Sequence, residues 1–132
     1  MNLKIGLSLF IISLLLTGCS NKPEDAVNNL FDGIKEGDYL KVSRNTNDKV
    51  AAKFSLTALK NCSVDKKKYK DDFALMHDCL VEEYAGMKVK NIDINLVSET
   101  EAKAKITVEN KSEEMIYIFK VLKIEEKWKV WK

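Results

Sequence analysis

The sequence predicts an α+β fold in which N-terminal helices pack on a four-stranded antiparallel meander. Two observations predict this class. Apolar residues recur at helical spacing as far as Gly86, and from Lys88 onward they alternate with polar residues. Short polar links separate the alternating segments, and links of this length join antiparallel neighbours. One face of the sheet would be apolar and covered by the helices.

The first 22 residues differ from this pattern and indicate export. Lys4 gives a basic start, and the apolar run from Ile5 to Leu16 is shorter than the ~20 residues that span a bilayer. The run ends in Leu16-Thr17-Gly18-Cys19, which resembles the lipobox of bacterial lipoproteins. That resemblance implies a signal peptide at residues 1–18, which is removed, and a short tether at 19–22 with palmitate-type acyl chains on Cys19.

The same resemblance implies where the protein resides. A lipidated Cys19 would attach the chain to a membrane of the bacterial cell envelope, facing the periplasm, with two or three acyl chains for stable binding. Ser20 follows the cysteine, which resembles the outer-membrane sorting pattern more than the inner-membrane one. Only three residues separate Cys19 from Pro23, and they reach ~10 Å when extended. The domain, residues 23–132, should therefore lie close to the bilayer.

The charge balance and the cysteine content indicate which kinds of ligand and cross-link to expect. Without Lys4, which would be removed with the signal peptide, the chain has 21 of its 22 basic residues and 20 acidic residues. This nearly neutral charge gives no reason to expect a nucleic acid as a partner. In an exported chain Cys62 and Cys79 favour a disulfide, and the alternative is two separate buried thiols. We expect no cofactor, and no metal site, because His77 alone lies near these cysteines.

Four helical segments are expected. Pro23 and the acids after it suit a first turn, and Gly37 suits the position just after a helix end. The remaining helices are expected at residues 39–44, at about 50–60 and at 66–84, before Gly86. The apolar sets of the four strands are expected at residues 92–96, 102–108, 115–121 and 128–130. The predicted core includes Leu30, Phe31, Ile106, Phe119, Val121 and Trp128.

The third strand is apolar on both faces. Ile116 and Ile118 lie on the side opposite the predicted core, and Trp131 shares that side if Trp128 points inward. One interpretation is a central strand with ordinary exposed apolar residues. The other is a surface for an envelope protein partner or for a homodimer. The sequence does not decide between these two interpretations.

Two segments resemble a known family. Ala26-Val27 through Ile34-Lys35-Glu36-Gly37-Asp38 is similar to the first helix and turn of small bacterial lipoproteins with a cystatin-like/NTF2-like domain of the DUF4878 type. Lys123-Ile124-Glu125-Glu126-Lys127-Trp128-Lys129-Val130 resembles their last hairpin. Residues 45–86 match poorly, and Cys62 and Cys79 belong to no pattern of that family. The resemblance implies an NTF2-like/cystatin-like cone and no particular activity, because the family has no established common function.

The function expected is a non-enzymatic binding or interaction module. The alternative is an NTF2-like enzyme of isomerase or hydrolase type, or a protein with a small-ligand pocket, which needs polar groups inside the cone. The residues considered for such a pocket are Asp93, Tyr39, Tyr69, Tyr117 and His77. Asp93 falls on the polar side of its strand, and no catalytic motif accompanies the others. No catalytic residue is therefore assigned.

Overall fold

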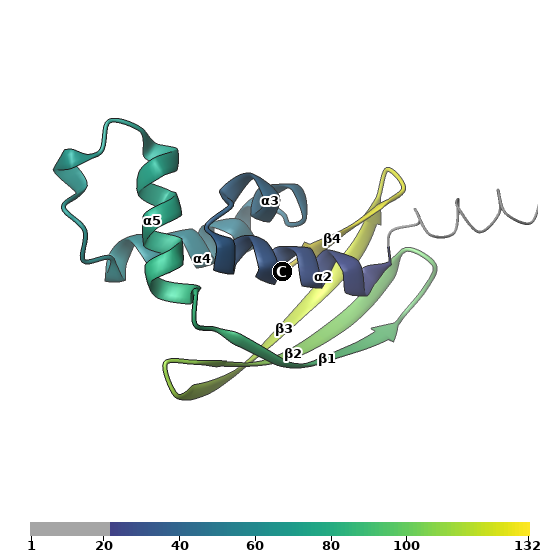
Figure 1. Cartoon of the computed structure of the whole chain (residues 1–132). Coiled ribbons are helices and arrows are strands. Elements are labelled where there is room, and N and C mark those ends of the chain that lie inside the picture. The colour runs from purple at the N-terminus through teal and green to yellow at the C-terminus, as the bar shows by residue number, and fades with distance from the viewer. Residues whose placement is uncertain (1–21) are drawn as a thin grey trace, which may run out of the picture.

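The computed structural model describes residues 22–132, so the predicted signal peptide (1–18) and the lipidation of Cys19 lie outside the described residues. Helices precede a four-stranded antiparallel sheet (Figure 1). The helical elements are α2 (Pro23–Glu36), α3 (Tyr39–Arg44), α4 (Asp48–Asn61), the 3₁₀ turn η1 (Lys66–Lys68) and α5 (Asp72–Tyr84). The strands are β1 (Lys88–Leu96), β2 (Glu101–Asn110), β3 (Glu113–Ile124) and β4 (Lys127–Trp131). The predicted α+β class is confirmed.

The sheet is a meander with the order β1-β2-β3-β4. Its β2–β3 and β3–β4 hairpins each turn on two residues with positive φ, Lys111-Ser112 and Glu125-Glu126. That conformation belongs to the two-residue turns whose twist matches the twist of paired strands. In β1 the register shifts between Val89 and Asn91.

Helix α2 lies across the inner face of the sheet and contacts β1, β3 and β4 (Figure 1). The six predicted core residues are all buried. Phe54 of α4 joins the helices to the sheet, because its ring packs against Phe31 of α2 and against Tyr117 and Phe119 of β3. The core therefore forms between the first helix, α4 and the inner side of the two central strands.

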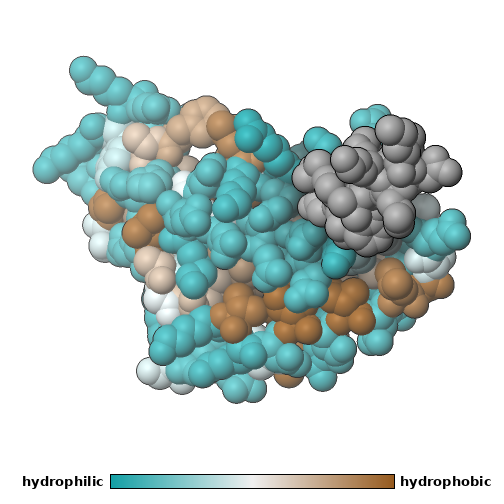
Figure 2. Space-filling model, turned by 45° about the vertical axis from the view of Figure 1, so that its right-hand side comes forward, coloured by the Kyte–Doolittle hydropathy of each residue, from teal (hydrophilic) through white to brown (hydrophobic). Residues whose placement is uncertain are grey.

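The two edges of the sheet differ. Beside β4, the backbone of Asn45 and Asn47 pairs with Val130, so part of this edge is covered. Strand β1 pairs with β2 alone among the described strands. Figure 2 shows apolar residues in a row along this side of the molecule, below the polar surface of α2. The β1 edge is therefore where the apolar layer between helix and sheet reaches the surface.

The predicted helix over residues 66–84 was wrong in its first part. The structure has the short turn η1, then a break, and α5 begins only at Asp72. The side chain of Asp65 accepts a hydrogen bond from the backbone of Lys67, and Asp71 accepts one from Phe73. Such local bonds compete with a continuous helix and start new ones. Phe73, in the first turn of α5, is exposed.

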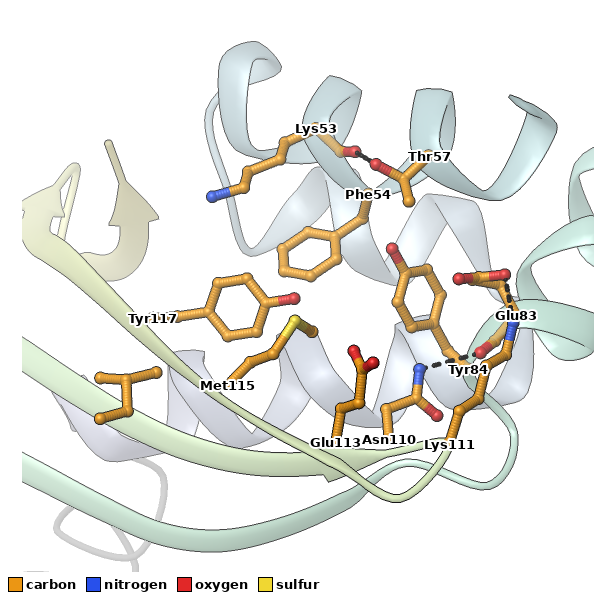
Figure 3. Close-up of a pocket in the computed structure, with 11 residues that line it drawn as sticks. Lys53, Phe54, Thr57, Glu83, Tyr84, Asn110, Lys111, Glu113, Met115 and Tyr117 are labelled. Atoms are coloured by element: carbon orange, nitrogen blue, oxygen red, sulfur yellow. Dashed lines mark hydrogen bonds and ion pairs between the residues drawn. The ribbon is translucent and has the colours of Figure 1, made fainter. Parts of the chain in front are cut away.

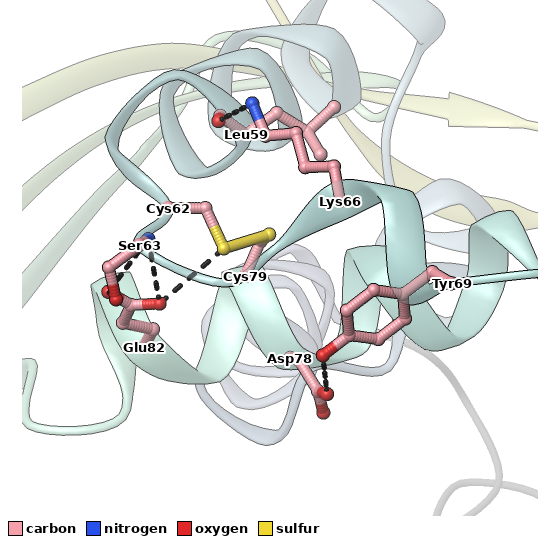
Figure 4. The surroundings of a disulfide bond; sticks show 8 residues. All are labelled: Leu59, Cys62, Ser63, Lys66, Tyr69, Asp78, Cys79 and Glu82. Carbon is pink, nitrogen blue, oxygen red and sulfur yellow. Dashed lines mark hydrogen bonds between the residues drawn. A yellow bond between two sulfur atoms is a disulfide. The ribbon is translucent and has the colours of Figure 1, made fainter.

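The predicted disulfide is present. Cys62 follows α4 and Cys79 lies within α5, and the bond joins the two helices with Cα atoms 5.2 Å apart (Figure 4). The Glu82 carboxylate accepts hydrogen bonds from the Ser63 amide at 3.1 Å and from its hydroxyl at 2.6 Å. It also lies 3.4 Å from Cys62 Sγ. The loop between α4 and α5 is thus attached to α5 at two adjacent points.

Candidate functional site

A pocket of about 580 Å³ opens between α4, the end of α5 and the β2–β3 turn (Figure 3). Aromatic, apolar and charged side chains line it. They are Lys53, Phe54, Thr57, Glu83, Tyr84, Asn110, Lys111, Glu113, Met115, Ile116 and Tyr117. A cavity of this size, with an apolar wall and a few polar groups, has the character of a small-molecule site.

Three elements bring these side chains together. Lys53 and Thr57 are four residues apart and so share one side of α4. Tyr84 is the last residue of α5, and its ring packs edge-on against Phe54. Tyr117 lies on the inward side of β3 and stacks beside Phe119. The pocket is therefore an extension of the aromatic core toward one end of the sheet.

Polar groups converge on the open space of this pocket. In Figure 3 the hydroxyl groups of Tyr84 and Tyr117 and the carboxylate of Glu113 point toward its centre. Burial, followed by the nearby Tyr117 and Glu83, raises the pKa of Tyr84 well above its ordinary value, although Thr57 opposes the shift. Burial and Glu83 also raise the pKa of Tyr117. Both phenols are therefore neutral at physiological pH, and they can donate hydrogen bonds.

Two further charged side chains of the pocket lining, Lys111 and Glu83, form an ion pair with each other. Lys111 Nζ lies 2.7 Å from a carboxylate oxygen of Glu83. Asn110 donates a hydrogen bond of 3.0 Å to the Glu83 backbone carbonyl. Lys53 Nζ lies 5.1 Å from the centre of the Tyr117 ring, within the range of a cation–π contact. Among the described residues, neither Lys53 nor Glu113 takes part in an ion pair.

The two central phenols are poorly suited to accept a proton from a ligand at neutral pH. A general base needs a pKa near the working pH, and the two central phenols are shifted away from it. Residues 22–132 contain no group of three or more His, Cys, Asp or Glu side chains placed to hold a metal ion. The pocket supplies neutral donors, aromatic faces and the Glu113 carboxylate, besides the Glu83 carboxylate that pairs with Lys111.

Of the five residues that the sequence suggested for a pocket, Tyr117 lines this one. Asp93 is exposed on the outer face of the sheet, as its strand position predicted. Tyr69 hydrogen-bonds Asp78 beside the disulfide (Figure 4). Tyr39 and His77 lie together instead at a second hollow of about 470 Å³, between the α2–α3 turn and α5. The five residues considered do not form one site.

Tyr84 and Glu113 were the residues that sequence reasoning missed. Tyr84 carries the helical periodicity of a core position, and Glu113 follows a polar turn, so neither stands out locally. Their meeting depends on the end of α5 lying over the β2–β3 turn.

The predicted partner surface lies on the outer face of the sheet. Ile118 is 73% exposed, and Ile116 on the same strand is exposed as well. Trp131 is half-buried and pairs across the strands with Lys120, on the face opposite Trp128. Lys105 lies opposite Ile118, so this face mixes apolar and basic side chains. The shared face is confirmed, and its use by a partner stays a prediction.

Comparison with known proteins finds a solved structure that resembles this fold at low sequence identity. No family profile matches the sequence, and no curated protein matches it. A crystal structure of a proposed NTF2-like transpeptidase from Campylobacter jejuni aligns with a TM-score of 0.47 and 17% identity, over 85% of this chain and 99% of that one. At this TM-score and identity, the similarity says nothing about the activity of this chain. Within residues 22–132 none of the helices has the length and apolar character needed to cross a membrane.

Proposed function

We propose that this chain is a bacterial cell-envelope lipoprotein with an NTF2-like domain, attached to the membrane by acyl chains on Cys19. Its folded domain is a non-enzymatic binding module that holds a small ligand in the pocket between α4, α5 and the β2–β3 turn. One observation carries the binding role. Two neutral tyrosine hydroxyls and the Glu113 carboxylate point into an aromatic-lined cavity of about 580 Å³.

The attachment rests on the sequence before the domain. A basic start, a short apolar run and Leu16-Thr17-Gly18-Cys19 agree in position with export, cleavage and lipidation. The outer membrane is the expected site because Ser20 follows the cysteine.

The protonation of the two central phenols supports binding without catalysis. Tyr84 and Tyr117 hold their protons more tightly than ordinary tyrosines. Glu83 is already paired with Lys111. Glu113 and Lys53 are the charges left to meet a ligand.

Native mass spectrometry of the full-length protein, released from its own membranes in mild detergent, tests the proposal. We expect a small additional mass beyond the lipid. Tyr84→Phe and Tyr117→Phe each remove a hydroxyl from the pocket and should lower the occupied fraction severalfold. Tyr69→Phe, which removes a hydroxyl beside the disulfide, is the matched control and should leave it unchanged. A wild-type protein that never carries a small ligand would contradict the pocket as its site.

The exposed outer face of the sheet favours a second candidate, an interaction module for another protein or a second copy. Its support is Ile118, which is 73% exposed beside Ile116. In the same spectra, a stoichiometric partner or dimer should disappear in Ile118→Asp and persist in Lys103→Asp, a charge change on the same face. Persistence in both variants would exclude Ile118 from the contact.

A further inference from the structure

The β1–β2 hairpin carries an exposed apolar tip. Leu96 ends β1 and is 69% exposed, and the next residue, Val97, is 55% exposed. Backbone bonds from Val97 and Ser98 to the Glu101 carbonyl hold the tip in a compact turn. Two consecutive apolar side chains therefore project from a structured loop rather than from a loose one.

This tip lies at the end of the domain where α2 begins. Gly37, the residue after α2, lies against His77 of α5, and three residues join the end of α5 to the start of β1. The first turn of α2 therefore points toward the other end of β1, where Leu96 lies. Figure 1 shows the start of α2 beside the β1–β2 hairpin.

The length of chain before α2 sets how far this end can be from the lipid. Three residues separate Cys19 from Pro23, and even fully extended they reach only ~10 Å. If Cys19 carries acyl chains in the bilayer, the start of α2 is held within about that distance of its surface. The hairpin beside it then lies at the end of the domain that is close to the lipid.

From this placement we propose that Leu96 and Val97 insert into the interfacial region of the bilayer that holds the lipid on Cys19. The proposal rests on the lipidation proposed above. The occupant of this apolar tip is the membrane, because the short tether holds the start of α2 near the bilayer and the tip lies beside that start. Glu99 and Glu101 flank the tip, so apolar contact rather than attraction to anionic head groups holds it there.

The inserted tip also fixes where the pocket faces. Strand β2 runs from Glu101 at the tip to Asn110 at the pocket, and ten residues of strand span ~30 Å. The domain would stand on its hairpin with the pocket at the end away from the bilayer. A ligand would then enter from the aqueous side rather than from the lipid.

A spin label at residue 97 tests this orientation. Cys62 and Cys79 are bonded, and Cys19 would carry lipid, so Val97→Cys adds the one free thiol of the mature protein. The full-length lipidated variant is reconstituted in vesicles of phosphatidylethanolamine and phosphatidylglycerol and labelled with a nitroxide. Glu114→Cys, exposed near the pocket end of β3, is the matched control.

We expect the label at 97 to be severalfold more accessible to oxygen than to a water-soluble nickel chelate, and the label at 114 to show the opposite. A label at 97 that the nickel chelate reaches as freely as at 114 would overturn the insertion and leave the lipoprotein proposal intact. A label shielded from both reagents would mean that protein covers the tip, which also overturns it. Mass spectrometry of the same sample checks the lipid on Cys19, and its absence would remove both proposals.

Discussion

The Glu83 carboxylate lies 2.7 Å from the Lys111 ammonium group, and this ion pair joins the end of α5 to the β2–β3 turn at the mouth of the pocket. The Glu83 side chain is only 11% exposed, so water screens the pair less than an ordinary surface pair. Asn110 reinforces the same junction through the Glu83 backbone carbonyl. The shape of the pocket mouth depends on this contact between two distant parts of the chain.

Removal of the Lys111 charge should destabilise the fold. Lys111→Met leaves a largely buried carboxylate without its cation, and we expect the free energy of unfolding to fall by about 1–2 kcal/mol. Lys90→Met is the matched control, because its pair with Glu109 is solvent-exposed and should contribute much less. Urea denaturation measures both. Equal losses would mean that burial of Glu83 does not strengthen its pair.

Gly37 should not tolerate a side chain. Its φ is +72°, and an added Cβ would lie 2.6 Å from the His77 carbonyl oxygen of α5. We expect Gly37→Ala to lower the free energy of unfolding by at least about 2 kcal/mol, because strain and the clash add. Gly86→Ala meets nothing within 4 Å and should be nearly neutral. Thermal unfolding of the two variants compares them, and similar melting temperatures would refute the steric argument.

The disulfide should contribute strongly to stability. It closes a loop with a sequence separation of 17, for which restriction of the unfolded chain gives about 3 kcal/mol. Reductant should therefore shift the urea midpoint of the wild-type protein downward. The variant Cys62→Ala/Cys79→Ala should already unfold at the lower midpoint and should not respond to reductant. A wild-type midpoint that reductant leaves in place would show that the bond is absent or contributes nothing.

Stability should decline in alkaline solution partly through Tyr84. Its pKa is raised in the folded state by burial first and then by Tyr117 and Glu83, so the unfolded chain ionises this phenol earlier. The contribution is complete below the unfolded pKa of about 10 and is lost as the pH rises above it. Melting temperatures measured up to about pH 11 should fall less steeply in Tyr84→Phe than in the wild type. Parallel profiles would contradict the assignment to this residue.

Cys19→Ala tests the membrane attachment directly. Without a sulfur to accept the diacylglyceryl group, the precursor should keep residues 1–18 and gain no lipid. Intact mass spectrometry and partitioning into detergent measure the two effects. Cys62→Ala/Cys79→Ala is the control and should be cleaved and lipidated like the wild type. A Cys19→Ala protein that is still processed and still partitions into detergent would refute the anchor.

Local sequence determined most of the elements. Helical periodicity and the glycine at 37 placed α2 correctly, and in the structure Asp38 caps α3, because caps and apolar spacing act over a few residues. Alternation placed the strands and the predicted core for the same reason. The compartment favoured a bonded Cys62–Cys79 pair, and the structure confirmed it.

Tertiary structure alone decided the rest. Helical periodicity did not reveal the break between η1 and α5, where local Asp caps compete with a continuous helix. The disulfide and Glu82 then attach this segment to α5. The pocket required Tyr84, at the end of a helix, to meet Tyr117 and Glu113 on a strand about thirty residues later. Sequence determines which side of its own element each residue occupies. Which elements then face each other depends on how the helices pack across the sheet, and that packing brings the pocket residues together.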